Sequence, residues 1–220
     1  MIRKFFSKKE EEPELPTDRG PLAVPIGGAL DIDMLGVEAS LAAGEPGMAI
    51  PTGGPFVVAA VGTAKLDTDM FLTRYYDDDN RILQVMAPKQ ADESGIVDIS
   101  IYQPWDSVSP ASESDWAEWT GPNGMIGAPT YDADGLMFDR FWGEGQGQAE
   151  LVEFVEAVDD GDTTVRIHQR CMLYSRAVGA GEEMLLLNIE RDLDDAAARE
   201  GASIEFLLGY GLGAGDVRRV

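Results

Sequence analysis

The most constraining feature of the sequence is a succession of short apolar runs separated by turn-forming clusters. The runs are rich in β-branched and aromatic residues, and they occupy residues 56–67, 71–76, 81–87, 95–103, 136–142, 150–158, 163–178, 183–190 and 203–212. No long helical pattern lies between them, so parallel crossovers are disfavoured. The sequence therefore predicts a mainly β (α+β) fold of antiparallel barrel- or sandwich-like sheets.

One to three short helices are expected beside the sheets. The segments with helix signals are residues 30–43, 112–119 and 192–200. In the first, Asp31 is the expected cap. In the second, Ser112 is the expected N-cap and Asp115 stands in the reciprocal position of an imperfect capping box. Trp116 and Trp119 lie three residues apart, which predicts that they anchor this helix to the sheet.

The sequence predicts a flexible N-terminal segment of basic head and acidic tether, residues 1–19, followed by one β-rich globular domain, residues 20–220. Two β halves would meet near residues 104–128, which are rich in proline and glycine. Residues 71–86 and 172–189 share a plan of apolar run, arginine beside tyrosine, turn and apolar strand. Either a duplicated β unit or a hairpin pattern common to many sheets explains this similarity.

The net charge limits the classes of binding partner, and the cysteine content limits the expected cellular compartment. The 220 residues carry 40 acidic and 17 basic side chains, a formal net charge of −23. Nucleic acid is therefore disfavoured as a partner, because its binding depends on basic side chains. The single cysteine and the lack of an apolar stretch of ~20 residues predict a cytoplasmic protein without a membrane span.

The first nine residues combine basic and aromatic side chains. The candidate contacts with an anionic membrane surface are Arg3, Lys4, Phe5 and Phe6. Such contacts would place the protein peripherally at the inner membrane. Three glutamates at 10–12 follow and oppose such binding. The alternative is an ordinary terminus that either frays or packs on the domain.

Two glycine-rich stretches resemble phosphate-binding loops in part. Gly209, Gly211 and Ala214 match the spacing of the dinucleotide fingerprint, but too few residues follow for the helix and strand that it requires. The sequence predicts a flexible segment at a strand end instead. Residues 143–148 (GEGQGQ) lack the lysine and hydroxyl residue of a P-loop, so we expect a plain loop and no nucleotide cofactor.

Neither metal ligation nor cysteine catalysis is supported by the spacing. Asp132 and Asp134 fit two positions of a calcium loop, but its first ligand and its bidentate glutamate are missing, so a hairpin turn is predicted. Because His168 is the single histidine, a metal site built on several histidines is excluded within one chain, and His168 with Cys171 supplies at most two soft ligands. His168 and Cys171 lie three apart in an expected strand, where they face opposite sides, and Cys171 is expected to be buried and inert.

Four residues are candidates for contact with a small ligand: Arg74, Tyr76, Arg170 and Arg176. Arg74 and Tyr76 share one face of an expected strand and offer a cation and a hydroxyl to an anionic or planar ligand. The alternative is that Arg74 pairs with a neighbouring aspartate while Tyr75 fills the core. No catalytic residues are indicated, because no serine elbow is present and the many carboxylates single out no pair.

Several segments together resemble the YjfK-like family of bacterial proteins of unknown function. They are RGPLAVPIGGALDID, FVVAAVGTAKLD, RYYDDDNRILQV, and LYSRAV followed by EEMLLLNIE. The family has no established activity or catalytic residues. The resemblance implies an accessory role near membrane-associated stress proteins that are similar to phage shock protein A.

Two functions follow as hypotheses. The first is a non-enzymatic interaction protein, linked to membrane stress, whose acidic surface binds a protein partner. The second is a protein or enzyme with a pocket in the β structure for a small ligand, either an anion or a polyamine.

Overall fold

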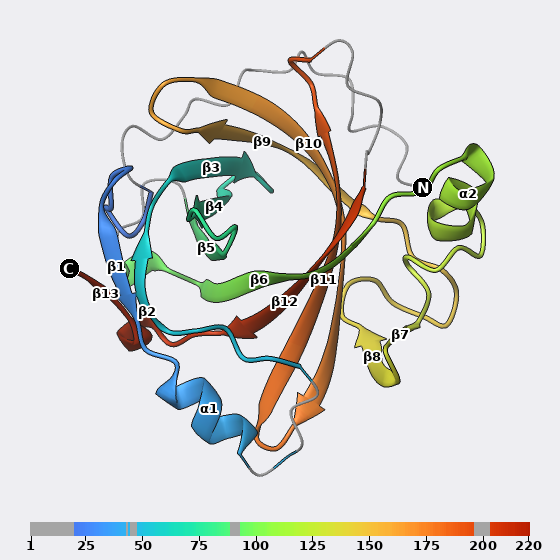
Figure 1. Ribbon diagram of the computed structural model, residues 1–220, viewed down its shortest axis with the longest axis horizontal. Coiled ribbons are helices and arrows are strands. Elements are labelled where there is room, and N and C mark those ends of the chain that lie inside the picture. Colours follow the sequence, from blue (N-terminus) through green and yellow to red (C-terminus); the bar gives the residue numbers. More distant parts are fainter. Residues whose placement is uncertain (1–19, 43, 45–47, 89–92, 196–202) are drawn as a thin grey trace.

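Eight strands close into an antiparallel barrel in the computed structural model, which describes residues 20–42, 44, 48–88, 93–195 and 203–220 (Figure 1). In spatial order they are β3 (Ala60–Lys65), β4 (Met70–Tyr76), β5 (Ile82–Pro88), β6 (Asp98–Val108), β12 (Ile204–Gly211), β11 (Gly181–Asp192), β10 (Thr164–Val178) and β9 (Val152–Asp159). The prediction of a mainly β, antiparallel fold is confirmed.

The barrel is closed by the hairpin of β10 and β11. The two strands pair from Ile167 with Asp192 to Val178 with Gly181. Strand β9 pairs with the first half of β10 and with β3, and so completes the ring. A closed ring leaves no unpaired edge within the barrel wall.

A second, three-stranded sheet covers one side of the barrel. It consists of β1 (Ala29–Ile32) between β2 (Gly54–Val57) and β13 (Val217–Arg219), and the helix α1 (Leu35–Leu41) follows β1 (Figure 1). Leu30, Ile32 and Phe56 from this sheet pack with Tyr75 and Ile101 from the barrel wall. The outer face of β4, β5 and β6 is thereby buried.

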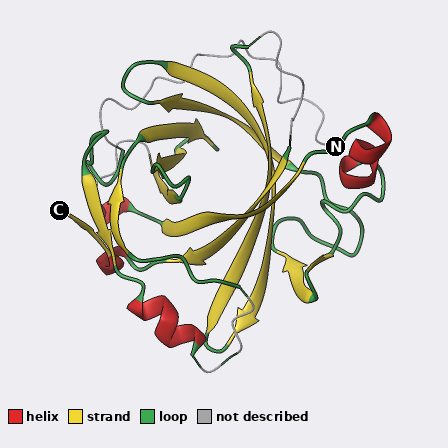
Figure 2. Cartoon of the chain, viewed as in Figure 1, coloured by secondary structure: helices red, strands yellow, loops and turns green. Residues whose placement is uncertain are grey.

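Another layer covers the outer face of β10, β11 and β12. It contains helix α2 (Glu113–Thr120) and the hairpin of β7 (Thr130–Ala133) and β8 (Leu136–Arg140) (Figures 1 and 2). Trp119 and Tyr131 pack on Phe206, each with its ring centroid 5.8 Å from that of Phe206. Two short 3₁₀ turns, Glu93–Gly95 and Ala214–Asp216, complete the described elements.

Two predicted elements differ from the structure. Residues 30–43 were expected as one helix, but the alternating Leu30 and Ile32 enter strand β1 and only Leu35–Leu41 is helical. Asp33, not Asp31, accepts the backbone N–H of Leu35 at the helix start. Residues 56–67 were expected as one strand, but the chain passes there from β2 in the small sheet to β3 in the barrel.

The glycine-rich C-terminal stretch is also more regular than expected. Gly209 and Gly211 lie in β12, and the chain then returns as β13 beside β1 instead of ending as a flexible segment. A Cβ on Gly209 would overlap the ring of Tyr102, its cross-strand partner. This glycine therefore leaves room for an aromatic ring inside the barrel.

Local signals were read correctly at three places. Ser112 and Asp115 form a reciprocal capping box at the start of α2, and Trp116 and Trp119 of this helix pack against the core on the β10–β12 side. Asp134 and Gly135 both have positive φ in the β7–β8 turn, as a tight hairpin requires. The helix predicted at residues 192–200 falls largely outside the described residues. No helix in the described part of the chain is long and apolar enough to cross a membrane.

Candidate functional site

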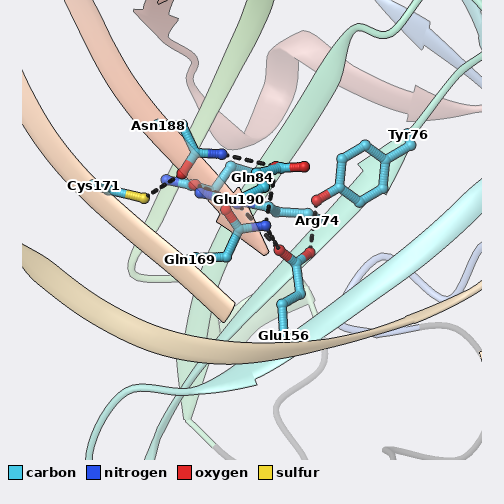
Figure 3. A network of polar contacts seen from close by, with 8 residues as sticks. All are labelled: Arg74, Tyr76, Gln84, Glu156, Gln169, Cys171, Asn188 and Glu190. Atoms are coloured by element: carbon cyan, nitrogen blue, oxygen red, sulfur yellow. Dashed lines mark hydrogen bonds and ion pairs between the residues drawn. The ribbon is translucent and has the colours of Figure 1, made fainter. Parts of the chain in front are cut away.

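The interior of the barrel has an apolar part and a polar part. Side chains alternate across a strand, so every second residue of each barrel strand points inward. Ile82, Tyr102, Leu173, Leu186 and Leu207 form the apolar cluster. Beside it, eight residues form a connected network of polar contacts: Arg74, Tyr76, Gln84, Glu156, Gln169, Cys171, Asn188 and Glu190 (Figure 3).

The strand register brings these distant residues together. Arg74 of β4 lies directly opposite Gln84 of β5. On the other side of the barrel, Gln169 of β10 faces Glu190 of β11, and Cys171 faces Asn188. Strand β9 then supplies Glu156 between the two groups, so five strands contribute to one network.

Arg74 and Glu156 form a buried ion pair at the centre. Arg74 Nη1 lies 3.1 Å from Glu156 Oε2, and the two side chains are 2% and 1% exposed. Arg74 Nε donates to Gln84 Oε1, and the guanidinium lies over the ring of Phe154. Burial lowers the pKa of Arg74, but nearby charges, that of Glu156 first, more than offset this effect. The pKa therefore lies above its ordinary value and the guanidinium stays charged.

The other oxygen of Glu156 accepts the hydroxyl of Tyr76 at 2.7 Å. Burial, followed by the charge of Glu156, raises the pKa of Tyr76 well above its ordinary value, so this hydroxyl remains a donor. Gly62 of β3 makes room for the carboxylate, because a Cβ at this position would overlap Glu156. A glycine on β3 is thus part of the site.

Gln169 connects the ion pair to Glu190. Its amide nitrogen donates to Glu156 Oε2 at 3.0 Å and to Glu190 Oε1 at 3.1 Å. Both partners are carboxylates, which only accept hydrogen bonds, so the amide nitrogen of Gln169 must face them. The amide oxygen therefore bonds to neither carboxylate. Gln169 is 1% exposed, and its Oε1 has no hydrogen-bond partner among the described residues.

Glu190 joins this buried network to the solvent. The residue as a whole is exposed, yet its carboxylate turns toward the network and also accepts from the Asn188 amide at 2.8 Å. Its pKa is raised mainly by withdrawal from solvent and also by the charge of Glu156. The bonds from Gln169 and Asn188 oppose this rise.

Cys171 is a structural member of the network. The side chain is completely buried, and its thiol donates to Asn188 Oδ1 at 2.8 Å. Burial raises the pKa of Cys171 to about 12, so the thiol is not a nucleophile at neutral pH. His168 lies on the opposite face of β10, where Glu153 approaches it at 3.5 Å, so the two residues form no dyad.

The four ligand candidates from the sequence do not form one site. Arg74 and Tyr76 lie inside the barrel, on one face as predicted. Arg170 lies on the outer face and contacts Glu153 at 3.1 Å. Arg176 is also on the outer face, 2.6 Å from the buried carboxylate of Glu183. The membrane candidates Arg3, Lys4, Phe5 and Phe6 lie outside the described residues.

Sequence reasoning missed most of the network. Glu156, Gln169 and Glu190 were unmarked among many polar residues, and Arg74 pairs with Glu156 rather than with a neighbouring aspartate. One signal was available: Glu156 and Gln169 occupy inward positions of apolar strands, where a polar residue requires a partner. The partner itself cannot be identified without the strand order.

Comparison with known proteins gives a family but no activity. A family model described as "Protein of unknown function (DUF2491)" matches residues 1–218. The chain belongs to this family. No curated protein and no solved structure matches the chain. The resemblance to YjfK-like proteins stays a prediction, and the function must be argued from the site.

Proposed function

We propose that the protein is a non-enzymatic binding protein that holds a small polar ligand at the polar part of its barrel interior. The observation that carries this proposal is the amide oxygen of Gln169, which is buried and has no partner among the described residues. A buried acceptor without a partner costs about 1–3 kcal/mol, and a ligand donor would remove that cost.

The composition of the network supports the same proposal. A buried ion pair with its hydrogen-bonded neighbours is often less stabilising than apolar residues of similar volume. Apolar side chains fill the neighbouring part of the same interior. A charged network beside them is therefore more consistent with recognition than with stability alone, and Glu190 provides contact with the solvent.

A thermal-shift screen of the full chain tests this function. Nucleotides, sugars, carboxylates, polyamines and divalent metals are each added in excess. A specific ligand at 100 times its dissociation constant would stabilise the protein by about 2.7 kcal/mol. The proposal requires that Gln169→Leu or Glu190→Gln weakens the effect of the ligand. If no compound stabilises the protein, or if both variants respond like the wild type, the proposal fails.

The net charge of −23 favours a second candidate, an accessory protein that binds a basic protein partner. Such binding is weakened by salt, because surface charges are screened beyond about 8 Å at physiological ionic strength. Pull-downs from a lysate at low and high salt test it, and recovery of no specific protein at low salt would remove its support.

The peripheral membrane role rests on the sequence of residues 1–9. Co-sedimentation with anionic and neutral vesicles, with and without these residues, tests it. Binding of the full chain to anionic vesicles alone, lost on truncation, is the expected result. Absence of binding by either form would contradict it.

A further inference from the structure

The polar atoms left open in the network accept hydrogen bonds rather than donate them. Gln169 Oε1 is the buried atom without a partner, and Glu190 carries a carboxylate that accepts only. Arg74 donates through Nε to Gln84 and through Nη1 to Glu156, and none of its nitrogens is among the buried atoms without a partner. Opposite Gln84, Ser100 of β6 has a buried hydroxyl without a partner among the described residues, and a hydroxyl can donate or accept. Beside Gln169 and Glu190, however, the open atoms are acceptors, which favours a ligand with donors over the anion considered from the sequence.

The charge of the site points in the same direction. Within the network one guanidinium, Arg74, faces two carboxylates, Glu156 and Glu190. Strand β12 adds Glu205, which lies directly opposite Asn188 and so on the same face of the wall. Arg74 is already paired with Glu156. The carboxylates of Glu190 and Glu205 therefore have no cationic partner within the network.

Two classes of cation could neutralise this negative charge: a metal ion and an organic ammonium. Among the described residues no group of three or more histidine, cysteine, aspartate or glutamate side chains could hold a metal ion. An ammonium needs fewer ligands directed at one point than a metal ion does, because its three N–H donors can bond to carboxylate and amide oxygens alike. One amide oxygen beside a carboxylate suits an ammonium better.

We infer that the site binds the primary ammonium group of an aliphatic polyamine, between Gln169 Oε1 and the carboxylate of Glu190. This inference rests on the proposed function and names its ligand class. The second ammonium of the same molecule would lie toward the acidic exterior, where the protein carries a large excess of carboxylates. The raised pKa of Glu190 agrees with a carboxylate that lacks a cationic partner.

Calorimetric titration of the full chain with putrescine and spermidine tests the inference, with Mg²⁺ as a cation that lacks N–H donors. Titrations at low salt and at physiological salt separate site binding from the screened attraction of an acidic surface. We expect one saturable amine site that persists at physiological salt, and weaker binding of Mg²⁺.

A pair of matched variants places the amine in the barrel. Glu190→Gln removes one charge at the site. Glu182→Gln removes one charge from an exposed position on the same strand, at its other end. Because a hydrogen bond to a charged group contributes about 1.5–3 kcal/mol, Glu190→Gln should weaken amine binding about tenfold or more. Glu182→Gln should leave the dissociation constant within about twofold.

A second measurement needs no substitution in the site. In the protein labelled with ¹⁵N-glutamine, the side-chain NH₂ signals of Gln169 should shift on amine addition, because its amide is fixed by Glu190 and Glu156. Signals of Gln103, whose amide donates to Ala49 outside the network, should not move. Unchanged Gln169 signals at saturating amine would overturn the inference.

The remaining outcomes separate this inference from the proposed function. Equal weakening by both variants, or equal binding of Mg²⁺ and amine, means attraction to the acidic surface and overturns the amine site. No amine binding together with stabilisation by another screened compound refutes the ammonium and leaves a ligand-binding barrel. Stabilisation by no compound refutes both.

Discussion

Arg74 and Tyr75 are neighbours in β4 and lie on opposite faces of the barrel wall. Tyr75 is 0% exposed in the outer core, and its hydroxyl accepts the backbone N–H of Leu22. Arg74 is 2% exposed on the inner face, where it depends on a carboxylate of β9. Both residues are buried, but for different reasons. Burial of Tyr75 removes apolar surface from water, whereas Arg74 can be buried only because Glu156 balances its charge.

This contrast predicts that removal of one residue of the Arg74–Glu156 ion pair destabilises the protein, and that removal of both restores part of the lost stability. Arg74→Met leaves Glu156 buried without its cation, so we expect a loss of about 3–5 kcal/mol in the free energy of unfolding. Urea denaturation measures the loss. The double variant Arg74→Met/Glu156→Met should be more stable than Arg74→Met alone. A double variant that is less stable would show that the two faces obey the same rule.

The strands and the alternation of their side chains were the more predictable features. Alternation within the apolar runs indicated the strands, their antiparallel pairing and the common face of Arg74 and Tyr76. Two segments were misread because residues 30–43 and 56–67 cross from one element to another, and local pattern does not show which sheet a strand joins. The prediction failed where tertiary pairing decides the structure.

The candidate site was predictable only in part for a related reason. Arg74 is separated from Glu156 by 82 residues, and nothing local to either residue indicates the other. The sequence offered inward polar positions but not their partners, because those depend on the closure of the barrel by β10 and β11. The sequence also could not show that Arg170 and Arg176 lie on the outer face, away from Arg74, because the relation between the faces of β10 and β4 depends on the same closure.

A smaller change tests how tightly the inner face is packed. Gly62→Ala would push a methyl group into the carboxylate of Glu156, and overpacking of this kind costs about 1–3 kcal/mol. Thermal or urea unfolding measures the cost. Gly211→Ala is the control, because open space surrounds the position of its Cβ. If both substitutions have the same effect, the glycine at 62 does not serve the ion pair.

The outer cover should respond to local changes without affecting the network. Ser112 accepts the backbone N–H of Asp115 at the start of α2, so Ser112→Ala should cost about 1 kcal/mol through loss of the cap. Urea unfolding measures it, and Glu118→Gln on the same helix serves as control. A change in the side-chain signals of Gln169 in this variant would contradict the separation of the two faces.

The smallest effect concerns the pH dependence of the inner face. The pKa of Glu190 is raised in the folded protein above its usual value of 4.5, so the folded state binds this proton more strongly than the unfolded state. Glu190 therefore favours folding most at acidic pH, and its contribution falls as the pH rises from 4.5 through the raised pKa. The groups that act on this carboxylate are Gln169, Glu156, Arg74 and Asn188, and Glu205 lies opposite Asn188 on the next strand.

Glu190→Gln should remove this part of the slope. We expect a difference below about 1 kcal/mol, because Glu190 as a whole residue is exposed and solvent therefore screens part of the interaction of its carboxylate. Urea unfolding at several pH values from 4 to 7, without amine, compares the variant with the wild type and with Glu182→Gln. The wild type should lose stability relative to Glu190→Gln as the pH rises, while Glu182→Gln follows the wild type. Parallel curves for all three would mean that the carboxylate of Glu190 is as well solvated as any carboxylate on the outer face. The buried polar network would then include Gln169 but not Glu190.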